Sequence, residues 1–186
     1  MDAIKALHSR VSVNLLEDPA PSDAQLKDIL KAGLRACDHK NLRPWRFLVI
    51  RDEARKPFGK LMADVMASQR ENGLDDHTRE KIESKPFRAP LIVVVAAKIV
   101  ADDKVPEIEQ IMSAAGSAQA IMTAAHALGI GAIWRSGSLM FEEKMVTGLG
   151  LDSQHKLIGF IYLGTPKMVK DVPTLSLDDH ITEWRG

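Results

Sequence analysis

Three short segments place basic and hydroxyl side chains close together, a combination that suits an anionic ligand. The first is Arg10-Val11-Ser12, in which an arginine fork and a serine hydroxyl two residues apart can reach one phosphate. Taken alone, the simpler interpretation of Arg10 is a solvated charge at the end of a helix. This segment by itself leaves both interpretations open.

The second segment runs over residues 35–45 and is rich in polar and basic groups, among them Arg35 and His39. Pro44 and Trp45 close it, and a loop of this kind suits an anionic ligand beside a planar ring. The alternative is structural, because a tryptophan often serves to anchor a loop to the core.

The third segment, residues 129–137, holds Trp134, Arg135 and Ser136 between glycines. Glycine permits close approach of the backbone to a ligand, and Arg135 with Ser136 again offers a charge and a hydroxyl. The alternative is a helix cap followed by a core strand and a turn. Three such segments in one chain favour shared binding of an anion.

No group of residues in the sequence supplies reactive chemistry of its own. The six histidines lack metal-ligand spacing, and there is neither a Gly-rich phosphate loop nor a nucleophile elbow. Cys37, the single cysteine, lies near His39, but residues so close in sequence rarely form a working dyad. If the chain is an enzyme, a bound cofactor is expected to carry out the reaction.

Composition excludes several classes of protein. The chain has 186 residues with 25 basic and 25 acidic side chains, so it lacks the positive surplus of a general nucleic-acid or membrane-surface binder. The longest apolar run, residues 91–97, is too short to span a bilayer, and the N-terminus lacks the apolar core of a signal peptide. We therefore expect a cytoplasmic protein whose residues 1–186 form one domain.

The elements that must position these segments can be predicted from periodicity and capping. Ser22 and Gln25 form a capping box that begins a helix, and Gly129 ends the longest helical pattern, residues 107–128. Residues 91–97 predict a strand buried on both faces. The other predicted helices cover residues 2–9, 58–66, 75–85 (as a surface helix or flap) and 141–149, and the other strands residues 47–51, 131–134 and 157–163. This pattern predicts an α+β fold, a mixed sheet with a long central helix against it.

In their order, these segments resemble the nitroreductase family of flavoproteins, in particular its short single-domain branch of bacterial NAD(P)H nitroreductases. Arg10-x-Ser12 is similar to the family's R-R-S start, and residues 33–47 are similar to its A-P-x-x-x-N-x-x-P-W-x-F signature. Further similarity lies in Phe87-Arg88-Ala89-Pro90 and in residues 104–106, 131–137 and 159–166. The resemblance covers nearly the whole chain.

The resemblance implies a homodimer with two FMN molecules at the subunit interface. Hydride would pass in a ping-pong reaction from NAD(P)H, through flavin N5, to a small electron-poor acceptor such as a nitroaromatic or a quinone, without a catalytic side chain. It implies that FMN is held by Arg10, Val11, Ser12, Trp134, Arg135 and Ser136, and by Arg35 and His39 of the partner subunit. A segment associated with the nicotinamide cofactor matches Ala124, Ala125, His126, Ala127, Leu128 and Gly129, although an apolar helix end is the simpler interpretation.

The sequence departs from the family's pattern at three places. Val11 stands at the second arginine, Cys37 at a proline, and Asn14 lies where a basic residue is frequent. These departures bear on flavin affinity and potential, and Arg43 is one candidate for compensation. Two alternatives stay open: a flavoenzyme of the same fold with different chemistry, and a non-catalytic dimer that binds flavin or nucleotide.

Overall fold

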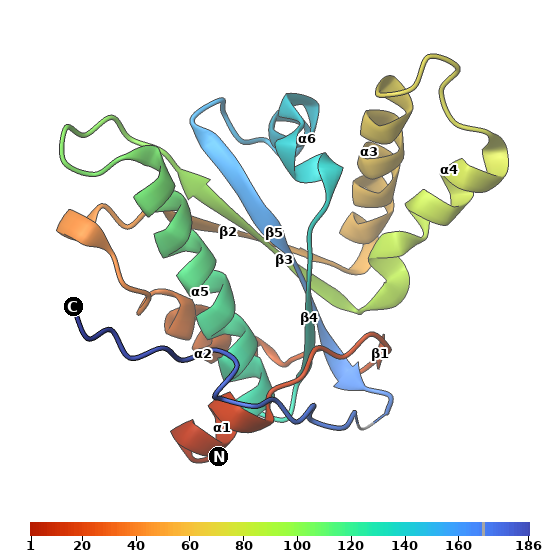
Figure 1. Cartoon of the computed structure of the whole chain (residues 1–186). Helices are drawn as coiled ribbons and strands as arrows, with labels where there is room; N and C mark the ends of the chain where they lie inside the picture. The colour runs from red at the N-terminus through yellow and green to blue at the C-terminus, as the bar shows by residue number, and fades with distance from the viewer. Residues whose placement is uncertain (169) are drawn as a thin grey trace.

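The computed structural model describes residues 1–168 and 170–186 as a central sheet with helices on both faces (Figure 1). The sheet runs in the order β1-β5-β3-β2, and β4 also pairs with β5. The strands are β1 (Leu16–Glu17), β2 (Trp45–Arg51), β3 (Leu91–Lys98), β4 (Gly131–Arg135) and β5 (His155–Pro166).

The helices begin and end where the sequence carries capping signals. Asp2 accepts hydrogen bonds from the backbone at the start of α1, and the capping box of Ser22 and Gln25 at the start of α2 is confirmed. Gly129, with a φ of 76°, follows the end of α5 as predicted. The helices are α1 (Ala3–Ser9), α2 (Asp23–Gly33), α3 (Arg55–Ser68), α4 (Asp76–Glu83), α5 (Glu107–Ala127) and α6 (Glu143–Gly148).

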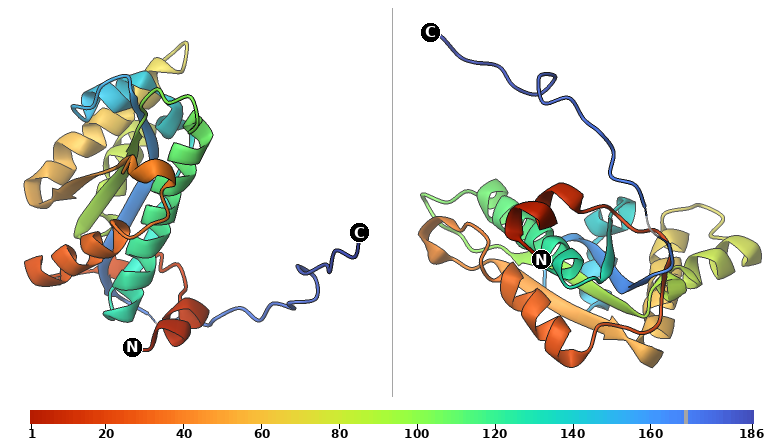
Figure 2. Two further views of the ribbon diagram at one scale, coloured as in Figure 1. Left: turned by 90° about the vertical axis from the view of Figure 1, so that its left-hand side faces the viewer. Right: turned by 90° about the horizontal axis from the view of Figure 1, so that it is seen from below.

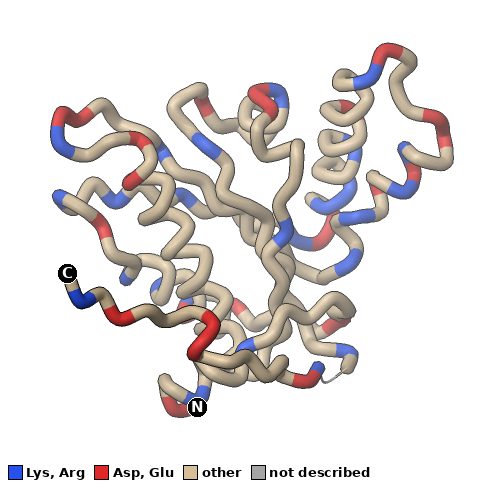
Figure 3. The backbone as a smooth tube through the Cα atoms, viewed as in Figure 1, with Lys and Arg blue, Asp and Glu red and all other residues tan. Residues whose placement is uncertain are grey.

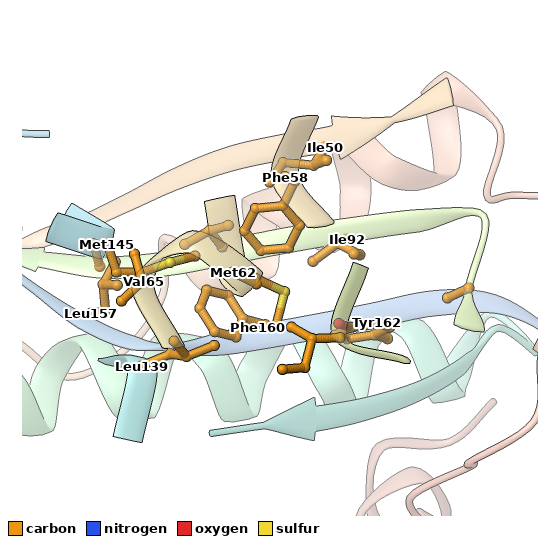
Figure 4. Packing of buried hydrophobic residues seen from close by; sticks show 14 of the residues in the cluster. Ile50, Phe58, Met62, Val65, Ile92, Leu139, Met145, Leu157, Phe160 and Tyr162 are labelled. Atoms are coloured by element: carbon orange, nitrogen blue, oxygen red, sulfur yellow. The ribbon is translucent and has the colours of Figure 1, made fainter. Parts of the chain in front are cut away.

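The central strand β3 is buried on both faces, which confirms the prediction. Its residues alternate between two cores, because successive side chains on a strand point to opposite faces. Leu91, Val93 and Val95 pack with α2 and α5, whereas Ile92 and Val94 pack with α3, α4 and α6. Figure 4 shows the second core, in which the rings of Phe58 and Phe160 meet edge to face with centroids 5.5 Å apart.

The α+β class and the long central helix are confirmed, but the sheet differs in detail from a mixed one. All four strand pairs between described residues are antiparallel. In the β2–β3 pair, for example, Arg51 lies opposite Leu91, so the excursion through α3 and α4 returns the chain to the end of the sheet that it left. Strand β1 was not predicted, and α6 begins at Glu143 because residues 138–141 form a separate 3₁₀ turn.

The end of the chain lies apart from these layers. Figure 2 shows residues 170–186 running away from the body of the molecule as an extended segment. Within the described residues, no helix is both long and apolar enough to cross a membrane.

Candidate functional site

The first and third predicted segments lie side by side. The N–H of Val13 donates a hydrogen bond of 2.9 Å to the carbonyl of Ala132 in β4, which holds the irregular stretch after α1 against that strand. Lys170 Nζ also donates to the Ser12 carbonyl, at 3.3 Å. The contact between Val13 and Ala132 brings the first and third segments together along β4.

Two arginine nitrogens in these segments are buried without a partner. Among the described residues, only three buried side-chain nitrogen or oxygen atoms lack a hydrogen bond, and two are Arg10 Nη1 and Arg135 Nε. The guanidinium of Arg135 also lies over the ring of Tyr162, 5.5 Å from its centroid. An unsatisfied buried donor costs about 1–3 kcal/mol, a cost that a bound anion would remove. The residues present thus fit a phosphate group.

Arg10 also affects a histidine at the end of α5. Ser9 Oγ donates to the Lys5 carbonyl at 2.6 Å, so it is free to accept a hydrogen bond from His126 Nε2, which lies 2.8 Å away. Burial lowers the pKa of His126, and the positive charge of Arg10 lowers it further. Both effects favour the neutral form of the His126 imidazole.

Replacing Arg10 with glutamine is expected to raise the pKa of His126, because a like charge is removed while the burial is kept. The measurement is an NMR titration of the His126 ring protons. Lys60→Gln, which removes an exposed positive charge from α3, is the control and should leave the titration unchanged. An identical midpoint in R10Q and the parent protein would contradict the proximity of Arg10 and His126.

The indole of Trp134 is fixed by a bulge in the neighbouring strand. Between β3 and β5 the register passes from Val95–Gly159 to Ala96–Leu157, so Ile158 has no partner on β3. The carbonyl of Ile158 accepts a hydrogen bond of 3.2 Å from Trp134 Nε1. Gly159 leaves the space for this ring, since a Cβ there would lie 2.0 Å from Trp134 Nε1.

Beyond the indole, Arg135 and Ser136 line a pocket of about 400 Å³ between β4, β5 and α3. Phe160 and Tyr162 contribute to its wall. The pocket combines aromatic and basic surface, as expected for a site that takes a planar, anionic ligand.

Arg35 and His39 lie elsewhere in the chain. They line a separate pocket of about 510 Å³ between their loop and α5, and His39 Nδ1 is 2.8 Å from Glu109 Oε2. The structure of one chain therefore does not bring them together with Arg10 or Arg135. Cys37 is exposed in the same loop, and His39 Nδ1 is paired with Glu109.

The loop that carries His39 has an unusual backbone. Lys40, Asn41 and Arg43 have left-handed φ angles of 59°, 57° and 50°. Such conformations cost about 1–3 kcal/mol each outside glycine and persist only where the surroundings hold them. Asp38 Oδ2 accepts from the Arg43 backbone N–H at 2.6 Å, and Lys40 pairs with Asp102 at 2.5 Å. Polar contacts from Asp38 and Asp102 thus hold the loop in this backbone conformation, which Pro44 alone did not predict.

The segment matched to the nicotinamide cofactor is the last turn of α5 with its cap. Ala125 is fully buried in the core, as an apolar helix end requires. His126 and Gly129, in contrast, line a pocket of about 490 Å³ together with Val11. Across residues 1–168 and 170–186, no three His, Cys, Asp or Glu side chains are grouped in a way that could hold a metal ion.

Comparison with known proteins gives one consistent result. The model of the nitroreductase family matches residues 7–165. Over 168 residues, 90% of either chain, the sequence is 44% identical to "Putative NAD(P)H nitroreductase YdjA" of Escherichia coli strain K12. A relative of the same description from Haemophilus influenzae is 32% identical over 185 residues, 98% of this chain and 99% of its own.

Solved structures share the fold. A nitroreductase-like family protein from Bacillus cereus superposes with a TM-score of 0.83 at 21% identity, covering 100% of this chain and 97% of its own. A "putative nitroreductase in complex with fmn" from Desulfovibrio desulfuricans superposes with a TM-score of 0.75 at 25% identity, covering 100% and 98%.

Proposed function

The chain belongs to the nitroreductase family, and from this premise we propose that it is an FMN-dependent oxidoreductase that passes electrons from NAD(P)H to a small electron-poor acceptor. One observation carries the proposal: the segments of Arg10 and Arg135 meet at the hydrogen bond between Val13 and Ala132, and Arg10 Nη1 and Arg135 Nε are both buried without partners. The names of the relative from Escherichia coli and of the FMN-bound neighbour support the choice of co-substrate and cofactor.

The chain's own residues bind and orient the cofactor in this proposal. Arg10 and Arg135 pair with the phosphate, and the hydroxyls of Ser12 and Ser136 donate to it. Trp134, fixed through the carbonyl of Ile158, and the backbone at Val11 set the position of the ring. When bound, FMN would supply the redox chemistry, the transfer of electrons from NAD(P)H to a nitroaromatic or quinone. No side chain is required as an acid or base.

NAD(P)H is proposed to approach from the end of α5. His126 and Gly129 line the pocket there, while Ala124, Ala125, Ala127 and Leu128 form the helix turn behind it. The neutral imidazole of His126 is a hydrogen-bonding group beside the positive charge of Arg10. The imidazole can exchange hydrogen bonds with the amide group of a nicotinamide nucleotide.

The site is proposed to be completed by a second copy of the chain, with Arg35 and His39 of the partner subunit at the flavin. Figure 3 shows that α5 carries no Lys, Arg, Asp or Glu beyond its first turn. Ile108 and Met112 on this helix are 59% and 64% exposed and lie one helix turn apart, so they offer apolar surface that a second copy would cover. The extended C-terminal segment likewise exposes Leu175, Leu177, Ile181 and Trp184.

Removal of residues 170–186 is expected to weaken the dimer by at least about tenfold, because burial of each large apolar side chain contributes about 1.5–3 kcal/mol. Sedimentation equilibrium of the shortened and full chains measures the dissociation constant. A full-length chain with Lys170 and Asp171 replaced by serine keeps the apolar side chains and serves as the control. Equal dissociation constants for the shortened and full chains would exclude this segment from the interface.

The proposed activity is tested by the colour and turnover of the purified protein. We expect a yellow protein that releases FMN on denaturation and oxidises NADH or NADPH when a nitroaromatic or quinone is supplied. A colourless protein to which added FMN does not bind would overturn the proposal. Flavin binding without any NAD(P)H oxidation would retain the cofactor and reject the oxidoreductase activity.

A further inference from the structure

Two additional cations share the pocket of Arg135. Lys85 and Arg88 lie at the two ends of the 3₁₀ turn Lys85–Arg88, which leads into β3. Both side chains line the pocket of about 400 Å³ that also contains Arg135, Ser136 and Tyr162. Neither residue belongs to the segments that the sequence motifs single out for flavin binding.

This basic pocket, defined by Lys85, Arg88 and Arg135, contains no compensating negative charge. None of the three forms an ion pair with a described residue, although Lys40, Arg51 and Arg79 elsewhere each pair with a carboxylate. Burial lowers the pKa of Lys85, and the charges of Arg88, Lys81 and Arg135 lower it further. Cations that converge without a counterion are stabilised by an anionic ligand.

Arg88 also lies near Asn14, the position at which a basic residue is frequent in the family. A neighbouring pocket of about 530 Å³ is lined by Asn14, Glu17, Arg88, Arg135 and Lys167. Glu17 is already paired with Lys167, at 3.4 Å, so Arg88 and Arg135 are the unpaired charges that face Asn14. Arg43, the candidate for compensation suggested by the sequence, lines neither pocket.

We propose that Arg88, supported by Lys85, contacts FMN together with Arg135 and supplies the positive charge that Asn14 does not. The inference rests on the proposed function and deepens it. The group recognised is a negative charge spread over oxygens, either the phosphate of FMN or the pyrimidine edge of the reduced ring. A guanidinium fork suits both, because it donates two parallel hydrogen bonds to such a group.

The test compares Arg88→Gln and Lys85→Gln with Lys60→Gln, an exposed lysine on α3 that lines neither pocket. FMN and riboflavin affinities are measured for each full-length variant by quenching of flavin fluorescence, and the midpoint potential of each holoprotein by equilibration with a redox dye. We expect R88Q to bind FMN about tenfold or more weakly, K85Q to show a smaller loss, and K60Q to match the parent. Circular dichroism checks that every variant is folded, and Arg88→Lys, which keeps the charge, should recover part of the loss.

The ligand group follows from which quantity changes in R88Q. A loss for FMN but not for riboflavin identifies the phosphate, whereas an equal loss for both with a lower midpoint potential identifies the reduced ring. R88Q and K85Q that match K60Q in affinity and potential would overturn the inference. If the parent itself binds FMN, that result leaves the proposed function standing, whereas a parent that binds no FMN removes both.

Discussion

Replacing both Arg10 and Arg135 with glutamine is expected to lower the affinity for FMN by about a thousandfold. Each residue offers a buried guanidinium nitrogen without a partner to the proposed phosphate site. A hydrogen bond to a charged group contributes about 1.5–3 kcal/mol, and about 1.4 kcal/mol corresponds to a tenfold change in affinity. Titration of the flavin-free variant with FMN, followed by flavin fluorescence, measures the loss.

The same substitutions are expected to leave the free energy of unfolding of the flavin-free protein unchanged or slightly higher. Removing a buried donor that has no partner removes its desolvation penalty, about 1–3 kcal/mol. Arg46→Gln is the matched control, because the Arg46 guanidinium is satisfied by the carbonyls of Arg43 and Trp45 at 2.9 and 2.8 Å. The control should lose stability and keep its FMN affinity. Equal flavin occupancy in the double variant and the parent would remove Arg10 and Arg135 from the site.

Much of the fold could be predicted because its signals are local. The apolar run at 91–97, rich in Val and Ile, indicated a strand covered on both faces, and β3 is fully buried from Leu91 to Ala97. The capping box at Ser22 and the glycine after α5 each satisfy backbone groups within a few residues. Helix ends of this kind are therefore visible in the sequence alone.

Features that depend on distant parts of the chain were not predictable in this way. Strand β1 has two residues and exists through its pairing with Thr165 and Pro166. The bulge at Ile158 places Leu157 and Phe160 in one core and Ile158 in the other. A strictly alternating strand pattern would put residues 157 and 160 on opposite faces, so this arrangement cannot be predicted from the pattern. The left-handed residues of the loop at 40–43 are held by Asp38 and Asp102, one of them about sixty residues away.

Individual residues of the candidate site could be predicted from the sequence, whereas the balance of positive and negative charges around the site could not. The sequence singled out Arg10 and Arg135, and the contact between Val13 and Ala132 brings their segments together. The sequence alone did not indicate which basic side chains lack a carboxylate partner, because ion pairing depends on the folded arrangement of all charges. Arg88 belongs to a short motif that carries no sign of a role at the site, and only the folded structure places it in one pocket with Asn14 and Arg135.

Replacing Gly159 with alanine is expected to lower both the stability of the fold and the affinity for FMN. The added Cβ would lie 2.0 Å from Trp134 Nε1 and 3.0 Å from the Arg135 carbonyl, so the indole has to leave its position and its bond to Ile158 is lost. Overpacking costs about 1–3 kcal/mol and a lost hydrogen bond about 1 kcal/mol, so the free energy of unfolding should fall by about 2–4 kcal/mol. Urea denaturation followed by circular dichroism measures this change.

A double-mutant cycle separates the collision with the indole from a general intolerance of side chains in β5. Trp134→Phe removes the nitrogen that the new Cβ would meet, at the cost of the hydrogen bond to Ile158. If the indole is the obstacle, G159A should cost less in the W134F background than in the parent, with a coupling of about 1 kcal/mol or more. FMN affinity should fall in G159A in step with the displacement of Trp134, because the same ring borders the proposed flavin site. Additive stability changes would mean that Gly159 serves the backbone of the bulge and not the indole, and unchanged FMN affinity in G159A would separate Trp134 from the flavin.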